Sequence, residues 1–145
     1  MLENRDYCDY DTCVALKELG YKVPTSAYYM PHHKDLIWVS NPFRGGYVID
    51  CFYSHNSLPK NVMTANFIDA PTLWEAQKWL MEEKDIDLAV YSGKGKDNDR
   101  IWVCNFVMEK TVYQLTHEGI VVKTFSSYEE ALSEGIKETV EILKK

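Results

Sequence analysis

The chain has 145 residues, of which 46% are hydrophobic and 26% charged, and its formal net charge is −6 at pH 7. These values exclude a disordered chain, which combines low hydrophobicity with high net charge, and they are typical of one globular domain. No apolar run approaches the ~20 residues that cross a bilayer. The polar start of the sequence does not have the pattern of a signal peptide, so we expect a cytoplasmic protein with no membrane partner.

The charge distribution argues against a nucleic-acid ligand. There are 16 basic residues against 22 acidic ones, and neither half of the chain is basic. Lysine and arginine supply most of the affinity for nucleic acid because they neutralise phosphates. We therefore do not expect nucleic acid as a partner.

Four cysteines are present, and we expect all of them to be reduced. Cytoplasmic chains of this length rarely contain disulfides and do not need them for stability. Cys51 and Cys104 lie in strand-like runs, where a free thiol behaves as a small apolar side chain. The other two are Cys8 and Cys13.

The first predicted element is a helix over about residues 11–19, with Asp9 or Asp11 as its N-cap. Gly20 follows as the left-handed residue that ends a helix, and Tyr21 is placed for the apolar contact that completes such an end. The apolar stripe of this helix consists of Ala15, Leu16 and Leu19.

Three strands are predicted next, because the following runs are rich in β-branched and aromatic residues. Turn residues separate these runs, and such short connections require antiparallel hairpins. The strands cover 25–30, 36–40 and 47–53, with turns at 31–35 and 41–46. The stretch 54–70 is predicted to be irregular, and connections of this length are usually functional or mobile.

A second helix is predicted from residue 73 to about 84, because Thr72 and Glu75 form the pattern of a capped start. On a helical wheel one apolar face contains Leu73, Ala76, Trp79 and Leu80. Trp74 and Met81 lie about 20° from each other and roughly 130–150° from that face.

The second half of the chain is predicted to contain about four strands and a third helix. Strands at 88–91 and 101–107 flank a polar turn at 93–99, and strands at 112–115 and 120–125 pair around His117-Glu118-Gly119. The last helix begins with a capping box formed by Ser127 and Glu130. Its apolar residues recur at steps of three and four and include Tyr128, Leu132, Ile136, Val140 and Leu143. Gly135 interrupts this pattern, which a close approach to a strand would explain.

This order of elements predicts an α+β fold. We expect a single domain over residues 1–145, in which antiparallel β meanders carry three amphipathic helices packed on the sheet. Residues 15–19 and 76–80 are similar, and both are followed by extended chain. This similarity indicates two helix-plus-meander halves.

One turn contains the residue types that bind metals, namely His32, His33 and Asp35. With Cys8 and Cys13 they include the nitrogen and sulfur ligands that Zn²⁺ prefers. However, the two cysteines are five residues apart and the adjacent histidines point in different directions, so the spacing rules for zinc are not met. We therefore predict no metal, no cofactor and no catalytic residue.

The strongest candidates for a partner surface are Trp74 and Met81, together with Tyr28 and Tyr29. A helix on a sheet needs one apolar face, so a second one requires a cover, either a loop of the same chain or another protein. Tyr28 and Tyr29 point to opposite faces of their strand, so one of them is expected to face outward. Tryptophan and tyrosine are common anchors of protein interfaces.

Two segments resemble small uncharacterised proteins encoded by phages and mobile elements of gut bacteria. They are Ala70-Pro71-Thr72-Leu73 to Lys78-Trp79-Leu80, and the ending that begins Ser127-Tyr128-Glu129-Glu130-Ala131-Leu132. The resemblance covers parts of the second and third predicted helices. That group has no assigned activity, so the resemblance implies a bacterial or phage cytoplasmic setting and assigns no functional residue.

The leading functional hypothesis is a non-enzymatic binding or assembly module that acts through protein–protein contacts. Its partner is a second copy of the chain or another protein. Two alternatives stay open. The first is a small metal-dependent hydrolase or nuclease that uses His32, His33 and Asp35, and the second is a nucleic-acid-associated accessory protein of phage type.

Overall fold

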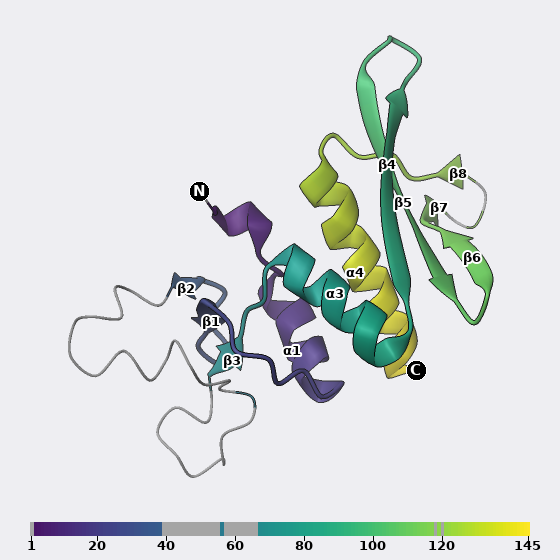
Figure 1. The fold of residues 1–145 in the computed structure, drawn as a ribbon. Helices are drawn as coiled ribbons and strands as arrows, with labels where there is room; N and C mark the ends of the chain where they lie inside the picture. Colours follow the sequence, from purple (N-terminus) through teal and green to yellow (C-terminus); the bar gives the residue numbers. More distant parts are fainter. Residues whose placement is uncertain (1, 39–55, 57–66, 118, 120) are drawn as a thin grey trace. The chain divides into compact units, whose positions relative to one another are not determined.

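The computed structural model describes residues 2–38, 56, 67–117, 119 and 121–145. Helices alternate with small antiparallel sheets along the chain, which confirms the predicted α+β class (Figure 1). The predicted strand at 47–53, the turn at 41–46 and Cys51 lie outside the described residues. Within the described parts of the chain, none of the helices combines the length and apolarity that a membrane span requires.

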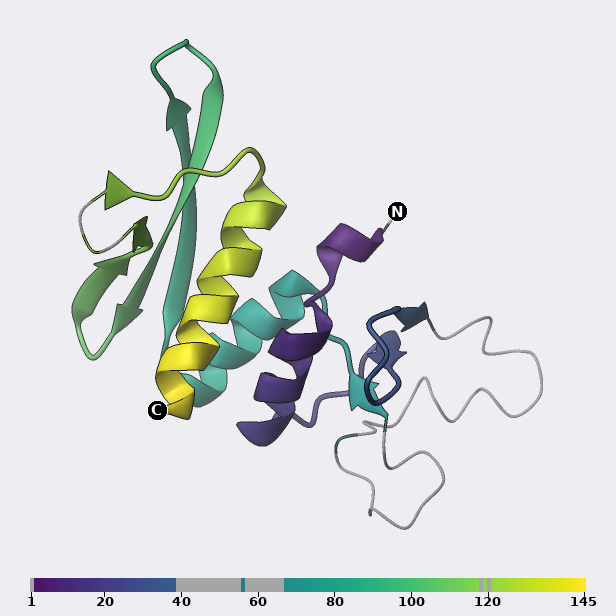
Figure 2. The ribbon, with the colours of Figure 1, turned by 180° about the vertical axis from the view of Figure 1, so that it is seen from behind.

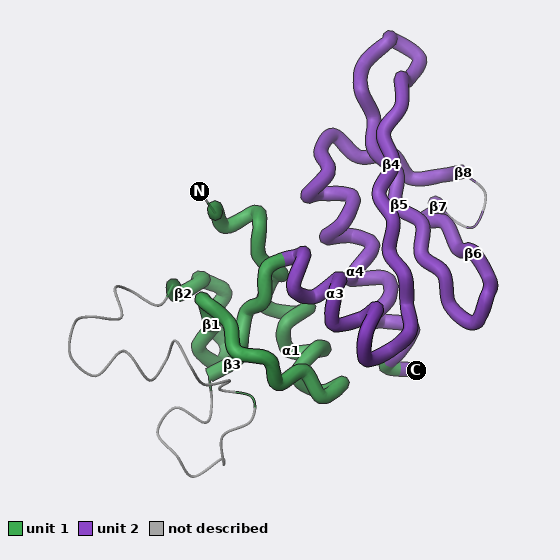
Figure 3. The backbone as a smooth tube through the Cα atoms, viewed as in Figure 1, with its two compact units in different colours: residues 1–72, 144 green, residues 73–143, 145 purple. Residues whose placement is uncertain are grey.

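Backbone contacts divide the chain into two compact units (Figure 3). Unit 1 is Met1–Thr72 with Lys144, and unit 2 is Leu73–Leu143 with Lys145. The division falls between the two halves that the sequence indicates. Each unit is described by itself below, and the single domain stays a prediction.

Among its described residues, unit 1 contains a short 3₁₀ helix, an α-helix and a three-stranded sheet. The strand order is β2-β1-β3, and both pairings are antiparallel, which confirms the hairpin predicted around residues 31–35. The elements are η1 (Asn4–Asp6), α1 (Tyr10–Glu18), β1 (Ala27–Tyr29), β2 (Ile37–Trp38) and β3 (Ile68–Asp69). The prediction that 54–70 is irregular is wrong at its end, because Ile68 pairs with Tyr29 in the sheet.

Local signals set both ends of α1. Asp9 is the N-cap, and its Oδ1 accepts a hydrogen bond from the Thr12 amide at 2.9 Å. Gly20 has a φ of +100°, as the sequence predicts. The Tyr21 amide then donates to the Leu16 carbonyl at 2.9 Å, which is the bond that closes a Schellman motif.

In the part of unit 2 that the structure describes, there are two helices and two antiparallel sheets, one with strand order β4-β5-β6 and one formed by β7 and β8. The elements are α3 (Leu73–Lys84), β4 (Asp87–Lys94), β5 (Arg100–Met108), β6 (Thr111–Gln114), β7 (Thr116–His117), β8 (Val121–Val122) and α4 (Tyr128–Lys144). The β4–β5 hairpin confirms the predicted turn, although the turn itself is shorter and begins after Lys94.

The pairing predicted for residues 112–115 and 120–125 is only partly correct. β6 pairs with β5 through a tight turn at Glu109 and Lys110. The hairpin around residue 119 consists of β7 and β8, and a hydrogen bond from the Lys123 amide to the Leu115 carbonyl at 2.8 Å continues it by one residue pair. Both residues of the β5–β6 turn have positive φ, 49° and 69°. The sequence carries no Asn-Gly or Asp-Gly signal for such a turn, which is why pattern analysis does not find it.

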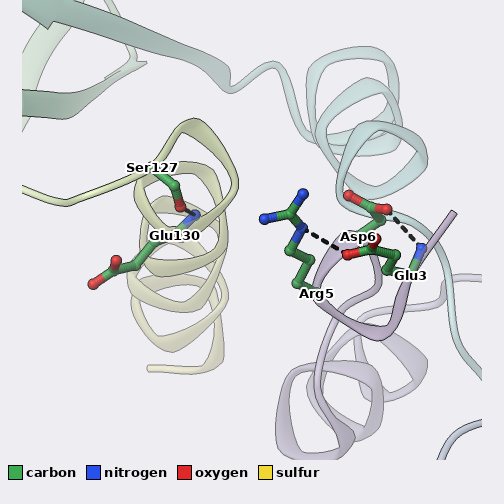
Figure 4. A network of polar contacts seen from close by, with 5 residues as sticks. All are labelled: Glu3, Arg5, Asp6, Ser127 and Glu130. Atoms are coloured by element: carbon green, nitrogen blue, oxygen red, sulfur yellow. Dashed lines mark hydrogen bonds and ion pairs between the residues drawn. The ribbon is translucent and has the colours of Figure 1, made fainter. Parts of the chain in front are cut away.

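Helix α4 lies against the β4–β5 part of the sheet (Figures 1 and 2). The Ser127 hydroxyl accepts from the Glu130 amide at 3.1 Å, which confirms the N-cap half of the predicted capping box (Figure 4). The Glu130 carboxylate accepts from the Ser126 hydroxyl at 2.7 Å instead of closing the box. Gly135 explains how the helix comes so close, because a Cβ at this position would overlap Cys104 Sγ and lie 3.1 Å from Leu88 Cδ2. The close approach to a strand that the sequence suggests is therefore present.

The residues predicted to lie under the sheet are buried, with one exception, while Tyr128 and Leu143 of the predicted α4 stripe are half-buried. Those buried are Leu16, Trp79, Leu80, Leu132, Ile136 and Val140. Leu19, at the end of α1, is only half-buried. Its position next to the left-handed Gly20 places it where the helix ends, beyond the fully packed turn that contains Leu16.

Candidate protein-binding surface on α3

Helix α3 has two apolar faces, as the helical wheel indicates. Leu73, Ala76 and Leu80 are 0% exposed and form the buried face. Trp74 is 38% exposed and Met81 is 48% exposed, although both are large apolar side chains. Exposed apolar side chains also occur elsewhere on the described surface, such as Tyr91 at 54%, so the distinguishing feature of this pair is that both side chains lie on one stripe of the same helix.

A hollow of about 160 Å³ lies between this outer face and the start of β4. It is lined by Trp74, Gln77, Lys78, Met81, Asp87 and Leu88, all of which belong to unit 2. Ligand pockets for whole small molecules usually measure roughly 300–1,000 Å³. The hollow is therefore closer in size to the site of one inserted side chain.

Polar groups define the rim of the hollow. Gln77 Nε2 donates to the Leu88 carbonyl at 3.0 Å and so joins the helix to the strand. Lys78 Nζ lies 3.8 Å from Glu82 Oε1, one helical turn away, and both side chains are exposed. An exposed pair of this kind contributes only about 0.3–0.5 kcal/mol, so Lys78 can exchange this partner for another at little cost.

Tyr28 and Tyr29 belong to unit 1, and Tyr29 does not fit the prediction of a partner surface. It is 5% exposed, and its hydroxyl donates to the Cys8 carbonyl at 2.8 Å. Its ring also meets Tyr10 edge to face at 5.7 Å. Burial, with additional effects from Cys13, Asp9 and Cys8, raises the pKa of Tyr29. Tyr29 is thus a core residue and is not part of the candidate surface.

Tyr28 is half-buried, as expected for the neighbour that points to the opposite face. Its ring stacks on Phe67 with the centroids 4.8 Å apart. Phe67 adjoins β3, so the stacked pair links two neighbouring strands of the unit 1 sheet. This contact already gives Tyr28 a structural role, and the candidate surface is based on Trp74 and Met81.

The metal alternative receives no support from the described residues. His32, His33 and Asp35 are all exposed. The backbone amide of His32 donates to the Tyr10 hydroxyl at 2.8 Å, and its φ is +64°. Over residues 2–38, 56, 67–117, 119 and 121–145, no group of three or more His, Cys, Asp or Glu side chains is arranged to hold a metal ion.

The acidic residues near the start of the chain have capping roles. Asp6 Oδ2 accepts from the Glu3 amide at 2.7 Å, and Glu3 Oε2 forms an ion pair with Arg5 Nε at 3.1 Å (Figure 4). Asp9 caps α1. The Asp6 and Asp9 carboxylates therefore accept hydrogen bonds from backbone amides at the starts of helices, where those amides have no partner within the helix.

Three cysteines are described, and all are free and buried: Cys8, Cys13 and Cys104. Burial raises the pKa of the Cys104 thiol to about 11. Burial and the neighbouring Cys8 raise the pKa of Cys13 well above its ordinary value. Because the thiolate is the nucleophile, these thiols are in poor environments for covalent chemistry at neutral pH.

The helical wheel predicts Trp74 and Met81 on the outer face but not the other residues of the hollow. Gln77 and Lys78 could have been found in the same way, because the four residues occupy positions i, i+3, i+4 and i+7 of one helical stripe. Asp87 and Leu88 join them only because the chain reverses between α3 and β4. No spacing in the sequence encodes that contact.

No protein-family model matches the chain. No curated protein matches it, and no solved structure matches its fold.

Proposed function

We propose that this chain is a non-enzymatic binding or assembly module that acts through protein–protein contacts, with the outer face of α3 as its binding surface. The observation that carries the proposal is the exposure of Trp74 and Met81 around a hollow opposite the buried face of the same helix. Tryptophan is enriched at the energetic centres of interfaces, and methionine adapts to irregular partners. The resemblance to phage and mobile-element proteins supports a bacterial or phage cytoplasmic setting.

The chemistry of the hollow suits a protein side chain. Trp74, Met81 and Leu88 supply apolar area, while Lys78 and Asp87 supply one charge of each sign at the rim. An apolar centre with a polar rim is the usual arrangement of a protein interface. We therefore expect a partner that inserts one apolar side chain and meets both rim charges.

The test is a double variant, Trp74→Glu with Met81→Lys, which leaves the net charge unchanged. Partners captured from a bacterial cytoplasmic extract are identified and purified, and their affinity is then measured by calorimetry. We expect the variant to keep the wild-type melting temperature and to bind at least about 10-fold more weakly, since losing a hot-spot residue costs 2 kcal/mol or more. Glu83→Lys, at an exposed position of α3 outside the hollow, is the control and should bind as the wild type does.

Two outcomes would contradict the proposal. If the double variant unfolds, Trp74 and Met81 belong to the core. If it stays folded with unchanged affinity and unchanged mass in sedimentation, the outer face of α3 is not a binding surface.

A further inference from the structure

The outer edge of β4 has backbone groups that face away from its sheet. Trp102 of β5 exchanges both of its backbone hydrogen bonds with Phe125, at 2.8 and 3.0 Å, so its amide and carbonyl point away from β4. Ser92 lies opposite Trp102 in the register, and its backbone groups must therefore also point outward. The direction of the backbone amide and carbonyl groups alternates from one residue to the next along a strand. The backbone groups of Leu88 and Val90 therefore also point away from β5.

One hydrogen bond supports this assignment directly. Gln77 Nε2 reaches the Leu88 carbonyl from the side opposite to β5. Among the residues that the structure describes, it is the one bond made to the backbone of this edge, and β4 is the terminal strand in the order β4-β5-β6. The amide and carbonyl groups of Val90 and Ser92 have no backbone partner within that part of the chain.

This edge lacks the features that usually prevent strand pairing. Natural edge strands are short, or they carry proline, inward charges or bulges. β4 has 8 residues, and neither a proline nor a charge occurs between Asp87 and Lys94. Its outer half extends past the beginning of α4 (Figures 1 and 2), and Tyr91 is 54% exposed there.

The charges at the two ends of β4 indicate which strand would pair with its outer edge. Asp85 and Asp87 lie at the start of β4, and Lys94 and Lys96 lie at its end, all exposed. A second β4 in antiparallel orientation places each acidic end beside the basic end of the other strand, whereas a parallel one would oppose like charges. The edge is thus self-complementary in both hydrogen bonding and charge, as a two-fold interface requires.

We propose that β4 pairs antiparallel with β4 of a second copy of this chain, so that two three-stranded sheets join across a two-fold axis. This inference rests on the proposed function in that both assume action through protein contacts. It uses the edge of β4, which shares Asp87 and Leu88 with the hollow on α3, and it names the partner. Strand addition of this kind derives its affinity from main-chain hydrogen bonds. The flanking Asp and Lys side chains are exposed, so salt should weaken the dimer.

The sharpest test is Val90→Pro. The Val90 amide points outward, so proline removes a donor that pairing needs without removing a bond between β4 and β5, and proline is tolerated at such edge positions. In sedimentation the wild type should have twice the 16.9 kDa mass of one chain, and Val90→Pro should have the single mass. Val90→Thr keeps the amide and the branched side chain, and as the control it should remain dimeric.

Hydrogen exchange provides a readout that does not depend on whether the proline variant folds. In the wild type, exchange of the Val90 and Ser92 amides should slow as the protein concentration rises. The amides of Ala89 and Tyr91 face β5, so they should be protected at every concentration. Val90 and Ser92 amides that exchange freely at every concentration would overturn the proposal.

The remaining outcomes separate this inference from the α3 proposal. A wild type that is monomeric at all accessible concentrations, or a folded Val90→Pro variant that stays dimeric, contradicts strand pairing. If Trp74→Glu with Met81→Lys dissociates the dimer while Val90→Pro does not, self-association uses the α3 surface and strand pairing is wrong. If Val90→Pro is monomeric and the α3 variant is still dimeric, strand pairing is supported whether or not the α3 surface binds a partner.

Discussion

Gly135 of α4 lies directly against Cys104 of β5, so close that a methyl group on Gly135 would overlap the cysteine sulfur. This contact allows the helix backbone to approach the sheet. Glycine in a helix interior costs about 1 kcal/mol relative to alanine. The chain accepts this cost at Gly135 because a larger residue does not fit there.

The first prediction follows from this contact. Gly135→Ala should destabilise the protein by up to about 2 kcal/mol, because an overpacking cost of about 1–3 kcal/mol is offset by about 1 kcal/mol of better helix propensity. Combining it with Cys104→Ala removes the overlapping sulfur and should recover part of the loss in a double-mutant cycle of urea unfolding. Additive effects of the two substitutions would show that the two residues do not touch.

The second prediction compares two neighbours on α3. Leu80 is fully buried and Met81 is 48% exposed. Leu80→Ala should lower the free energy of unfolding by about 2–5 kcal/mol, as for other buried leucines, whereas Met81→Ala should change it by less than about 0.5 kcal/mol. Similar losses at both positions in chemical denaturation would mean that the outer face of α3 is part of the core.

Features that depend on a few consecutive residues could be predicted from the sequence. The cap at Ser127 and the helix end at Gly20 each involve residues within one or two turns of a helix, and both are present. The burial of Leu80 and the exposure of Met81 follow from the 3.6-residue period alone. A strand of two residues, such as β3, is too short to show the two-residue alternation of a strand, so the sequence pattern does not predict it.

Features that depend on tertiary contacts could not be predicted. The hollow needs Asp87 beside Met81, and the free edge of β4 depends on which neighbour β5 bonds to on each side. Tyr28 and Tyr29 show the same limit. Strand alternation predicts that they face opposite ways, but only the contact of Tyr29 with Cys8 shows which one is buried.

The third prediction concerns the turn between β5 and β6. Glu109 and Lys110 both have positive φ, in a two-residue hairpin that normally favours Asn-Gly. Replacing the pair by Asn-Gly should raise the free energy of unfolding by about 1–3 kcal/mol. Left-handed geometry costs other residues roughly 1–2 kcal/mol each, and the larger entropy that glycine loses on folding offsets roughly 0.5–1 kcal/mol of the gain. The control is Asn-Gly at Asp97 and Asn98 in the longer β4–β5 turn, where only Asn98 has positive φ. A smaller gain is expected there, and equal gains would argue against the strain at Glu109 and Lys110.

The last prediction is a pH dependence of stability that arises from a buried thiol. Burial raises the pKa of Cys104 from its ordinary value of 9.0 to about 11 in the folded protein. Between these two values the unfolded chain has lost the thiol proton and the folded chain still holds it, so the unfolded state binds fewer protons and stability falls as pH rises. The contribution is fully present below pH 9 and is lost by about pH 11. Melting temperatures measured across this range should therefore decrease, and Cys104→Ala should reduce the slope without abolishing it, because the pKa values of Cys13 and Tyr29 are also raised by burial. An unchanged slope in Cys104→Ala would show that this thiol ionises equally in both states, and therefore that α4 does not seal it from water.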